Sequence, residues 1–296
     1  MTDSASYDGA RVRFAAGAAH VRPAVPVPED MLAGRLSVLS PGTERRQLAA
    51  TLSGPARDAG YMSLGKSEGD AWVLAPAPHG AAFAADTAGA LAVPHGTSLP
   101  VAAIGRFQLM AAMGLTRLPA GTDVQDAVVV GSGPVALGCM LALRRHGAER
   151  TRVLTARRYT PIGRAPGVNC VAEVEAGSAT LVIDATGRPE KAADLVAAGG
   201  ILGILGTPDE NSVLSSLAAH RGGWTIIGMH ELAPAPDGSY QRAYTDAVSW
   251  LTAYLDPQLV ASWCRRVPGH FAPRIFELLD QPGRPAEPVV LFEWSA

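Results

Sequence analysis

The stretch Ala127–Gly138, AVVVGSGPVALG, decides the fold. A short β-branched run leads directly into a glycine turn, and an apolar segment typical of a helix follows. Gly131 permits a tight turn out of the strand, Gly133 lets a phosphate approach the backbone, and Ala136 supplies a third small residue where helix packs on strand. The helix N-terminus offers unpaired N–H groups to an anion. The stretch predicts a strand–turn–helix unit that binds a dinucleotide, with a bare glycine turn as the alternative.

Strands and helices alternate after this turn, which is typical of a doubly wound parallel sheet. The expected strands are Ala127–Val130, Arg152–Ala156, Thr180–Ile183, Ile201–Leu205 and Trp224–Ile227. The expected helices are Val135–His146, Pro189–Ala197 and a segment from Tyr240 to Tyr254.

The segment before the turn follows a different pattern, in which short apolar runs alternate with proline and glycine. Expected strands are Arg11–Phe14, Arg35–Leu39, Ala71–Leu74 and Ala90–Val93, with a last strand at Pro288–Trp294. Expected helices are Glu44–Leu52, Pro100–Leu115 and Pro273–Leu279, and Tyr61–Asp70 is interpreted as a glycine-rich loop. The sequence therefore predicts a β-rich part beside the α/β part.

Composition narrows the class of protein further. The chain has 296 residues, 48% of them hydrophobic, and a formal net charge of −2, which gives no reason to expect nucleic acid or a membrane as a partner. The first thirteen residues are polar and lack the apolar core of a signal peptide. The three cysteines show no metal-binding spacing. We therefore expect a reduced, cytoplasmic protein.

Three motifs carry a resemblance to a known family: Ser40–Glu44 (SPGTE), the glycine turn, and Val182–Pro189 (VIDATGRP) followed by Gly199–Gly200. The chain resembles the medium-chain dehydrogenase/reductase superfamily, whose members are similar to zinc alcohol dehydrogenases. The SPGTE form is similar to a bacteriochlorophyllide dehydrogenase-like sub-branch. The resemblance implies an α/β fold with a GroES-like β-rich catalytic domain (1–123 and 256–296) and a Rossmann dinucleotide-binding domain (124–255).

The same resemblance implies where a catalytic zinc would take its ligands. The matching positions hold Pro41, Tyr61 and Arg106. Proline has no ligating side chain, and a guanidinium is a permanent cation that repels a metal. Because a catalytic zinc needs three protein ligands, we expect a zinc-free member with no metal site.

Without zinc, other residues must stabilise or protonate the substrate oxygen. Arg106 could polarise a carbonyl, although a structural pair with Glu44 is the alternative. Tyr61 could donate a proton, or it could be a buried structural tyrosine. Thr43 matches the family's hydroxyl relay position, but Ser40 or Thr43 could instead cap the following helix.

His230 follows a late strand of the parallel sheet, where ligands of such sheets bind. We expect it near the nicotinamide, with a loop histidine bonded to backbone as the alternative. The remaining histidines considered have no ligand spacing and are interpreted as surface residues: His79, His95, His146, His220 and His270.

The second strand of the dinucleotide unit predicts which cofactor binds. An NAD site needs an acid there for the ribose 2′-hydroxyl, but the sequence has Thr155, Arg157 and Arg158. Paired guanidinium groups suit a 2′-phosphate, so we expect NADP(H), with a solvated basic loop as the alternative. The expected cofactor-binding residues are Gly131, Gly133, Pro134, Val135, Thr155, Arg157, Arg158, Ala185, Thr186, Gly206 and Thr207.

Three functions remain open. The first is an NADPH-dependent, zinc-free reductase of a carbonyl or an activated C=C in a small organic molecule, with a role in specialised metabolism. The second is a quinone or enoyl reductase in which no protein acid is essential. The third is a catalytically silent NADPH-binding scaffold. Many proteins of the resembled family pair through the last Rossmann strand, which implies a homodimer.

Overall fold

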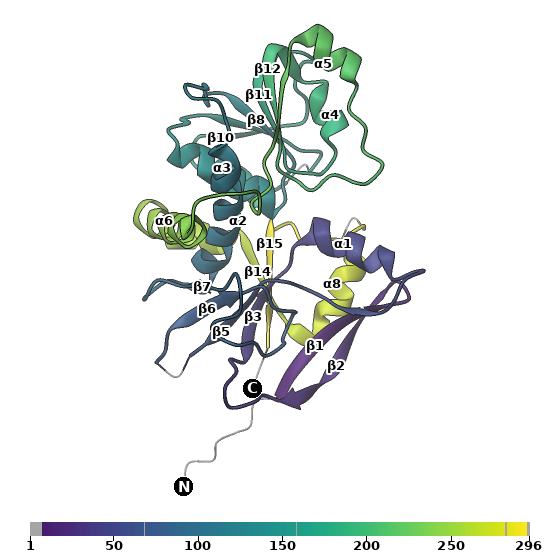
Figure 1. The fold of residues 1–296 in the computed structure, drawn as a ribbon, viewed down its shortest axis with the longest axis vertical. Helices are drawn as coiled ribbons and strands as arrows, with labels where there is room; N and C mark the ends of the chain where they lie inside the picture. Colours follow the sequence, from purple (N-terminus) through teal and green to yellow (C-terminus); the bar gives the residue numbers. More distant parts are fainter. Residues whose placement is uncertain (1–7, 68, 158, 282, 295–296) are drawn as a thin grey trace. The chain divides into compact units, whose positions relative to one another are not determined.

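The structure, a computed structural model, describes residues 8–67, 69–157, 159–281 and 283–294. The chain divides into two compact units. Unit 1 comprises residues 1–102 and 264–296, and unit 2 comprises residues 103–263. Each unit has its own sheet system (Figure 1).

Unit 1 is built on two sheets. A six-stranded sheet has the order β14-β15-β3-β5-β6-β7, and a three-stranded sheet has the order β2-β1-β4. All strand pairs in unit 1 are antiparallel except β14 and β15, which run parallel. The strands are β1 (Asp8–Ala15), β2 (Ala18–Pro26), β3 (Gly34–Val38), β4 (Arg57–Asp58), β5 (Ser63–Lys66), β6 (Trp72–Ala75), β7 (Leu91–Ala92), β14 (Cys264–Pro268) and β15 (Val289–Glu293). The helices are α1 (Pro41–Ala50), α8 (Ala272–Leu278) and the short 3-10 turn η2 (Gly269–Phe271).

An apolar cluster joins the two sheets to α8. The rings of Phe14 and Phe276 meet edge to face with centroids 4.9 Å apart, and Phe292 of β15 is fully buried beside them. Such aromatic pairs stabilise a core beyond their buried area. The β-rich character predicted for this part of the chain is confirmed.

The loop predicted for Tyr61–Asp70 is wrong at its centre. Ser63–Lys66 forms β5, which lies inside the six-stranded sheet between β3 and β6. Gly65 misled the prediction because glycine is typical of turns. In the structure it is required for packing: a Cβ there would lie 2.9 Å from the ring of Phe83 and from the backbone of Ala33.

Unit 2 contains one six-stranded parallel sheet with the order β10-β9-β8-β11-β12-β13. The four residues of β8 are all buried, as expected for a central strand covered on both faces. The predicted α/β class with a doubly wound parallel sheet is confirmed. The strands are β8 (Ala127–Val130), β9 (Thr151–Leu154), β10 (Val168–Val171), β11 (Ala179–Asp184), β12 (Val196–Ile204) and β13 (Thr225–Gly228). The helices are α3 (Pro134–Arg145), η1 (Pro161–Arg164), α4 (Pro189–Ala193), α5 (Ser216–Gly222), α6 (Ser239–Tyr254) and α7 (Pro257–Ser262).

Helix α2 (Leu99–Leu115) is buried almost all round, as its apolar sequence requires. Within unit 2, α3 approaches it so closely that a Cβ on Gly138 would lie 2.3 Å from the carbonyl oxygen of Phe107. Only glycine fits at this helix–helix contact, so the last residue of the opening stretch fixes how α3 packs.

One helix prediction in unit 2 needs correction, and several elements were missed. The helix predicted for Pro189–Ala197 ends at Ala193, because Val196 already pairs with Ala179 as the first residue of β12. Tertiary strand pairing overrides helix propensity there. The elements that were not predicted are β10, η1, α5 and α7 in unit 2, and β2, β4, β14 and η2 in unit 1. Among the described residues, no helix combines the length and apolar character needed to cross a bilayer.

Candidate functional site

The glycine turn lies at the centre of the parallel sheet. Gly131 follows β8 with a φ of 115°, a conformation that favours glycine, and its N–H donates to the carbonyl of Leu154 (2.9 Å). Gly133 is the N-cap of α3, and Pro134 at the first helical position needs no N–H partner. A Cβ on Gly133 would meet no atom within 4 Å, so the backbone borders open space. The turn can therefore accept an anion at a helix N-terminus.

This turn lies where the order of strands along the sheet reverses. Chain connections run from β8 to β9 on one side and, later, to β11 on the other. In open parallel sheets, ligands bind outside the carboxyl ends of the strands at such a switch point. The turn after β8 therefore has both the position and the backbone geometry of a dinucleotide site.

The carboxyl ends of the neighbouring strands meet at the same place. A Cβ on Gly131 would lie 2.9 Å from the side chain of Thr186, which follows β11. A Cβ on Gly206, which follows β12, would lie 2.9 Å from the backbone nitrogen of Thr186 and 2.8 Å from the carbonyl carbon of Ala185. The structure therefore brings together predicted cofactor residues from three strand ends. Of the others, Val135 is half-buried and Thr207 is exposed.

Thr155 connects the end of β9 to the glycine turn. Its hydroxyl lies 2.8 Å from that of Ser132 and accepts a hydrogen bond from the N–H of Arg157 (3.1 Å). Arg157 is half-buried, whereas Arg158 lies outside the described residues. The residues that follow β9 up to position 159 include no carboxylate. The site thus lacks the acid that would accept from a ribose 2′-hydroxyl.

Asp184, which was not predicted, shapes the turn after β11. Its carboxylate accepts from the N–H (2.9 Å) and the hydroxyl (2.6 Å) of Thr186 and from the N–H of Gly187 (3.0 Å). Burial is the main influence on its pKa and raises it above the ordinary value, while these hydrogen bonds oppose the rise. The Thr186 hydroxyl is therefore engaged within its own turn.

Arg106 is in a different pair from the one considered from sequence. Its guanidinium binds the carboxylate of Glu231 through two hydrogen bonds, of 2.6 and 3.0 Å, and lies over the ring of Tyr240 at 5.4 Å. The Tyr240 hydroxyl donates to the same carboxylate (2.5 Å). The alternative pair with Glu44 is wrong, because the two carboxylate oxygens of Glu44 bind the Ser40 N–H and His79. A bidentate pair with both side chains about 10% exposed leaves Arg106 largely neutralised.

His230 lies beside this pair in the chain but turns to its own backbone. Its side chain is exposed, and Nδ1 accepts from the N–H of Leu232 (3.2 Å). This is the geometry of the loop-histidine alternative. A role near the nicotinamide stays a prediction.

A second buried polar cluster lies in unit 1. His79 Nε2 is 2.7 Å from the carboxylate of Glu44, and its Nδ1 is 2.8 Å from the hydroxyl of Ser37, which also accepts from the indole N–H of Trp294 (2.9 Å). The side chains of His79 and Glu44 are both 0% exposed. The interpretation of His79 as a surface residue is therefore wrong.

Tyr61 and Ser40 continue this cluster toward solvent. The half-buried Tyr61 donates its hydroxyl proton to the Ser40 side chain (2.7 Å), and the Ser40 N–H donates to Glu44 (2.8 Å). Ser40 is the N-cap of α1, but its hydroxyl makes no capping bond, so the predicted side-chain cap is wrong for Ser40. Thr43 is half-buried in the first turn of α1.

The donor chemistry at the three positions matched to zinc ligands does not suit this metal. Pro41 starts α1, the Tyr61 hydroxyl is bonded to Ser40, and Arg106 carries a positive charge. Across the described residues, no three His, Cys, Asp or Glu side chains gather as a metal site would require. Burial also raises the pKa of the Cys139 thiol, which disfavours the thiolate that binds zinc.

Comparisons with known proteins bear on the fold. A scan of the sequence against protein-family models found no match, and a search of curated proteins found none either. Solved structures do match. Acetophenone reductase from Geotrichum candidum, in complex with NAD, has 12% identity and a TM-score of 0.76, with 97% of each chain covered. The fold is the same.

Two further structures agree. Galactitol-1-phosphate dehydrogenase from Escherichia coli has 14% identity and a TM-score of 0.73, covering 96% of this chain and 99% of its own. A protein from Sinorhizobium meliloti bound to NADP has 17% identity and a TM-score of 0.71, covering 96% and 98%. The expected GroES-like plus Rossmann architecture is thereby confirmed, at identities that establish fold alone.

Proposed function

We propose that the chain is an NADP(H)-dependent, zinc-independent oxidoreductase that reduces a carbonyl or an activated C=C in a small organic molecule. The observation that supports it most is the convergence of Gly131, Thr186 and Gly206 at the switch point of the parallel sheet. The fold shared with nicotinamide-bound structures supports the same class of chemistry. When bound, the nicotinamide supplies the hydride.

The preference for NADP(H) rests on the end of β9. A free carboxylate there would repel a 2′-phosphate, and the sequence offers Arg157 and Arg158 in its place. Thr155 holds the backbone of Arg157 and contacts the glycine turn through Ser132. Cofactor selectivity is therefore proposed to depend on this short turn.

Tyr61 is the proposed source of the proton that accompanies the hydride. A phenol is a neutral donor near pH 7, and the hydroxyl of Ser40 lies within hydrogen-bond reach to replace the lost proton (2.7 Å). Thr43, Arg106 and His230 remain secondary candidates. Arg106 is the weaker of these for oxyanion binding, because Glu231 already occupies two of its donors.

The neutralised Arg106 also favours a second function. A quinone or enoyl reductase in which the cofactor does nearly all the chemistry needs no free cation from the protein. Substituting Tyr61→Phe separates the two. A fall in kcat of about a hundredfold supports the first function, and near-normal turnover supports the second. Tyr254→Phe, on the exposed surface of α6, is the matched control.

The decisive experiment is a fluorescence titration of the full chain with NADPH and with NADH, with a metal assay on the same sample. Tight NADPH binding, weak NADH binding and no zinc support the proposal. Stoichiometric zinc would contradict the proposed zinc independence. If neither nucleotide bound, the cofactor proposal would fail.

Variants sharpen the cofactor assignment. Arg157→Gln should weaken NADPH binding by about tenfold and leave NADH binding nearly unchanged, because only NADPH carries the extra phosphate. Arg152→Gln is the matched control, since this arginine bonds instead to the carbonyl of Asp126. NADPH binding without hydride transfer to any carbonyl or enone would instead favour the silent scaffold.

We also propose a homodimer formed through β13. This strand ends the sheet order and carries the exposed Ile226, and two further exposed apolar residues, Val213 and Leu217, lie between β12 and β13 in the sequence. An apolar edge strand is a template for pairing with another chain. Light scattering of the wild type and of Ile226→Lys tests this: a dimer that becomes a monomer supports the proposal.

A further inference from the structure

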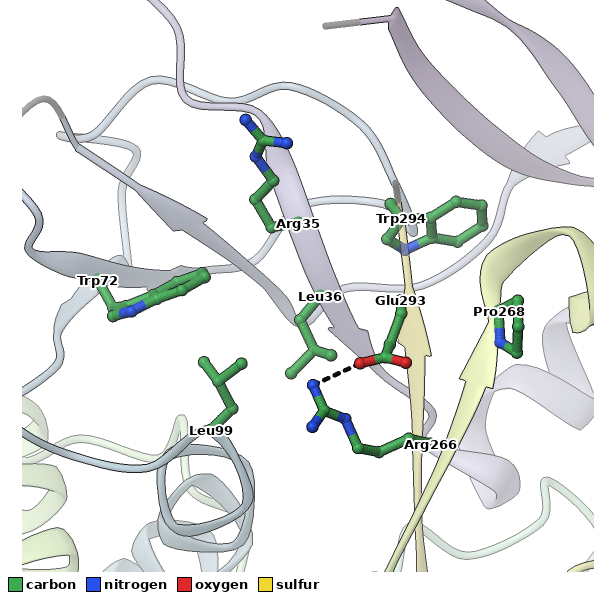
Figure 2. A pocket seen from close by; sticks show the side chains of 8 residues that line it. All are labelled: Arg35, Leu36, Trp72, Leu99, Arg266, Pro268, Glu293 and Trp294. Carbon is green, nitrogen blue, oxygen red and sulfur yellow. Dashed lines mark ion pairs between the residues drawn. The ribbon is translucent and has the colours of Figure 1, made fainter. Parts of the chain in front are cut away.

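Unit 1 contains a cavity of about 340 Å³ on one face of its six-stranded sheet (Figure 2). Strand register explains the shared face: Glu293 pairs with Leu36 on one side and with Pro268 on the other, and Arg266 lies two residues before Pro268. The volume is at the small end of the range for ligand sites. The cavity therefore suits a small molecule and not a macromolecule.

One end of the cavity is apolar and partly aromatic. Figure 2 shows the indole of Trp72 beside the side chains of Leu99 and Leu36. Trp72 and Leu99 are half-buried and Leu36 is 2% exposed. A flat ring placed here would cover the indole face and displace water from Leu99.

The other end is charged. Arg266 forms an ion pair with Glu293, drawn as a dashed line in Figure 2, with side chains 54% and 40% exposed. The pair uses Nη2 of Arg266, and a guanidinium has further N–H donors. Arg35 also lines the cavity, with its guanidinium directed away from the pair. The remaining donors of Arg266 give this end of the cavity a group that can bind an anion.

We propose that this cavity binds a small planar aromatic carboxylate, with its ring on Trp72 and its carboxylate on Arg266. Ring and carboxylate match the two ends of the cavity, and the lining residues all belong to unit 1. The proposal is therefore independent of the proposed oxidoreductase activity.

Calorimetric titration of the full chain with 2-naphthoate tests it. Saturable one-to-one binding is expected, with at least about tenfold weaker binding of uncharged 2-naphthamide and of the non-aromatic decahydro analogue. Saturating NADPH should leave the affinity unchanged. Absence of saturable binding, equal binding of the analogues, or competition with NADPH would overturn the proposal.

Variants identify the two ends. Trp72→Leu and Arg266→Gln should each weaken 2-naphthoate binding by about tenfold. Arg265→Gln is the matched control: it is the adjacent residue of β14, on the opposite face of the strand, and is similarly exposed at 51%. It should change the affinity by less than about twofold, and an effect equal to that of Arg266→Gln would show a general charge effect and overturn the site.

Glu293→Gln is expected to change the affinity for 2-naphthoate in the opposite direction. It removes the carboxylate that competes for Arg266, so 2-naphthoate should bind about threefold tighter. Weaker binding by this variant would contradict the assignment of the ligand carboxylate to Arg266. Circular dichroism of each variant verifies that unit 1 remains folded.

Discussion

The two units each bury an ionisable pair, and the pairs differ in kind. In unit 1, Glu44 and His79 are fully enclosed, and every polar neighbour given above is a hydroxyl, an indole or a backbone N–H. In unit 2, Arg106 and Glu231 are about 10% exposed and bound by a two-pronged contact. Imidazole exists readily as a neutral base, whereas a guanidinium does not lose its charge in proteins.

This difference predicts which of the two basic side chains depends more on the charge of its carboxylate partner. If Glu44 lost its charge, His79 could adopt the tautomer that its neighbours require. If Glu231 lost its charge, Arg106 would keep its positive charge and lose the carboxylate that binds two of its donors. Because the Glu44–His79 pair is the more buried, exposure alone would predict that it loses more stability when its carboxylate is neutralised. The permanent charge of the guanidinium predicts the larger loss for the Arg106–Glu231 pair instead.

The largest effect is expected for Glu231→Gln. The new amide presents its NH₂ group toward a guanidinium that only donates, so the variant should lose about 3 kcal/mol of unfolding free energy. Urea unfolding followed by circular dichroism measures it.

Glu44→Gln is the matched comparison. Its amide oxygen can still accept from the Ser40 N–H, and its NH₂ can donate to His79 once the imidazole proton moves to the nitrogen facing Ser37. The expected loss is about 1 kcal/mol. Equal losses for the two variants would contradict the distinction between the pairs.

A double-mutant cycle sharpens the comparison. Arg106→Met should be destabilising because it leaves the Glu231 carboxylate without its cation, but combining it with Glu231→Leu should recover much of the loss. The coupling free energy should be about 2 kcal/mol. The cycle His79→Gln with Glu44→Gln should give about half of that, and a larger value there would reverse the assignment.

Local signals account for what the sequence predicted well. The β-branched run Val128–Val130 followed by Gly131 predicts a strand and a turn without any distant contact. Cofactor residues at the ends of β11 and β12 were also predicted from the sequence. The structure brings these residues together at one edge of the sheet. Gly65 shows the limit of such reasoning, because a glycine required by packing has the same letter as one required by a turn.

The buried pairs could not be predicted because their partners are far apart in sequence. Glu44 and His79 are separated by 35 residues, and Arg106 and Glu231 by 125. Neither His79 nor Glu231 has a local pattern that identifies a partner. The sequence suggested Glu44 as the alternative partner of Arg106, and only the fold identified Glu231.

A smaller loss of unfolding free energy is expected for Ser37→Ala, which removes a neighbour of the Glu44–His79 pair. The change removes the acceptor of the Trp294 N–H and a partner of His79 Nδ1. Loss of these two buried hydrogen bonds should cost about 1 to 2 kcal/mol, measured by urea unfolding. Ser262→Ala, a half-buried serine that bonds to the carbonyl of Leu259, is the control and should cost less.

The smallest expected effect concerns Asp184, a third buried carboxylate, which is held by hydrogen bonds from Thr186 and Gly187. Burial raises its pKa above the ordinary 3.8, so over the interval between these values the native state keeps a proton that the unfolded chain has released. Stability contributed by this group is therefore lost as the pH rises through that interval, and is constant above it. Asp184→Asn does not titrate. The unfolding free energy of the wild type minus that of the variant should fall from about pH 3.5 upward and then level off. A difference that rose with pH would mean that the hydrogen bonds outweigh desolvation, and Asp184 would then resemble the paired carboxylates of the two units.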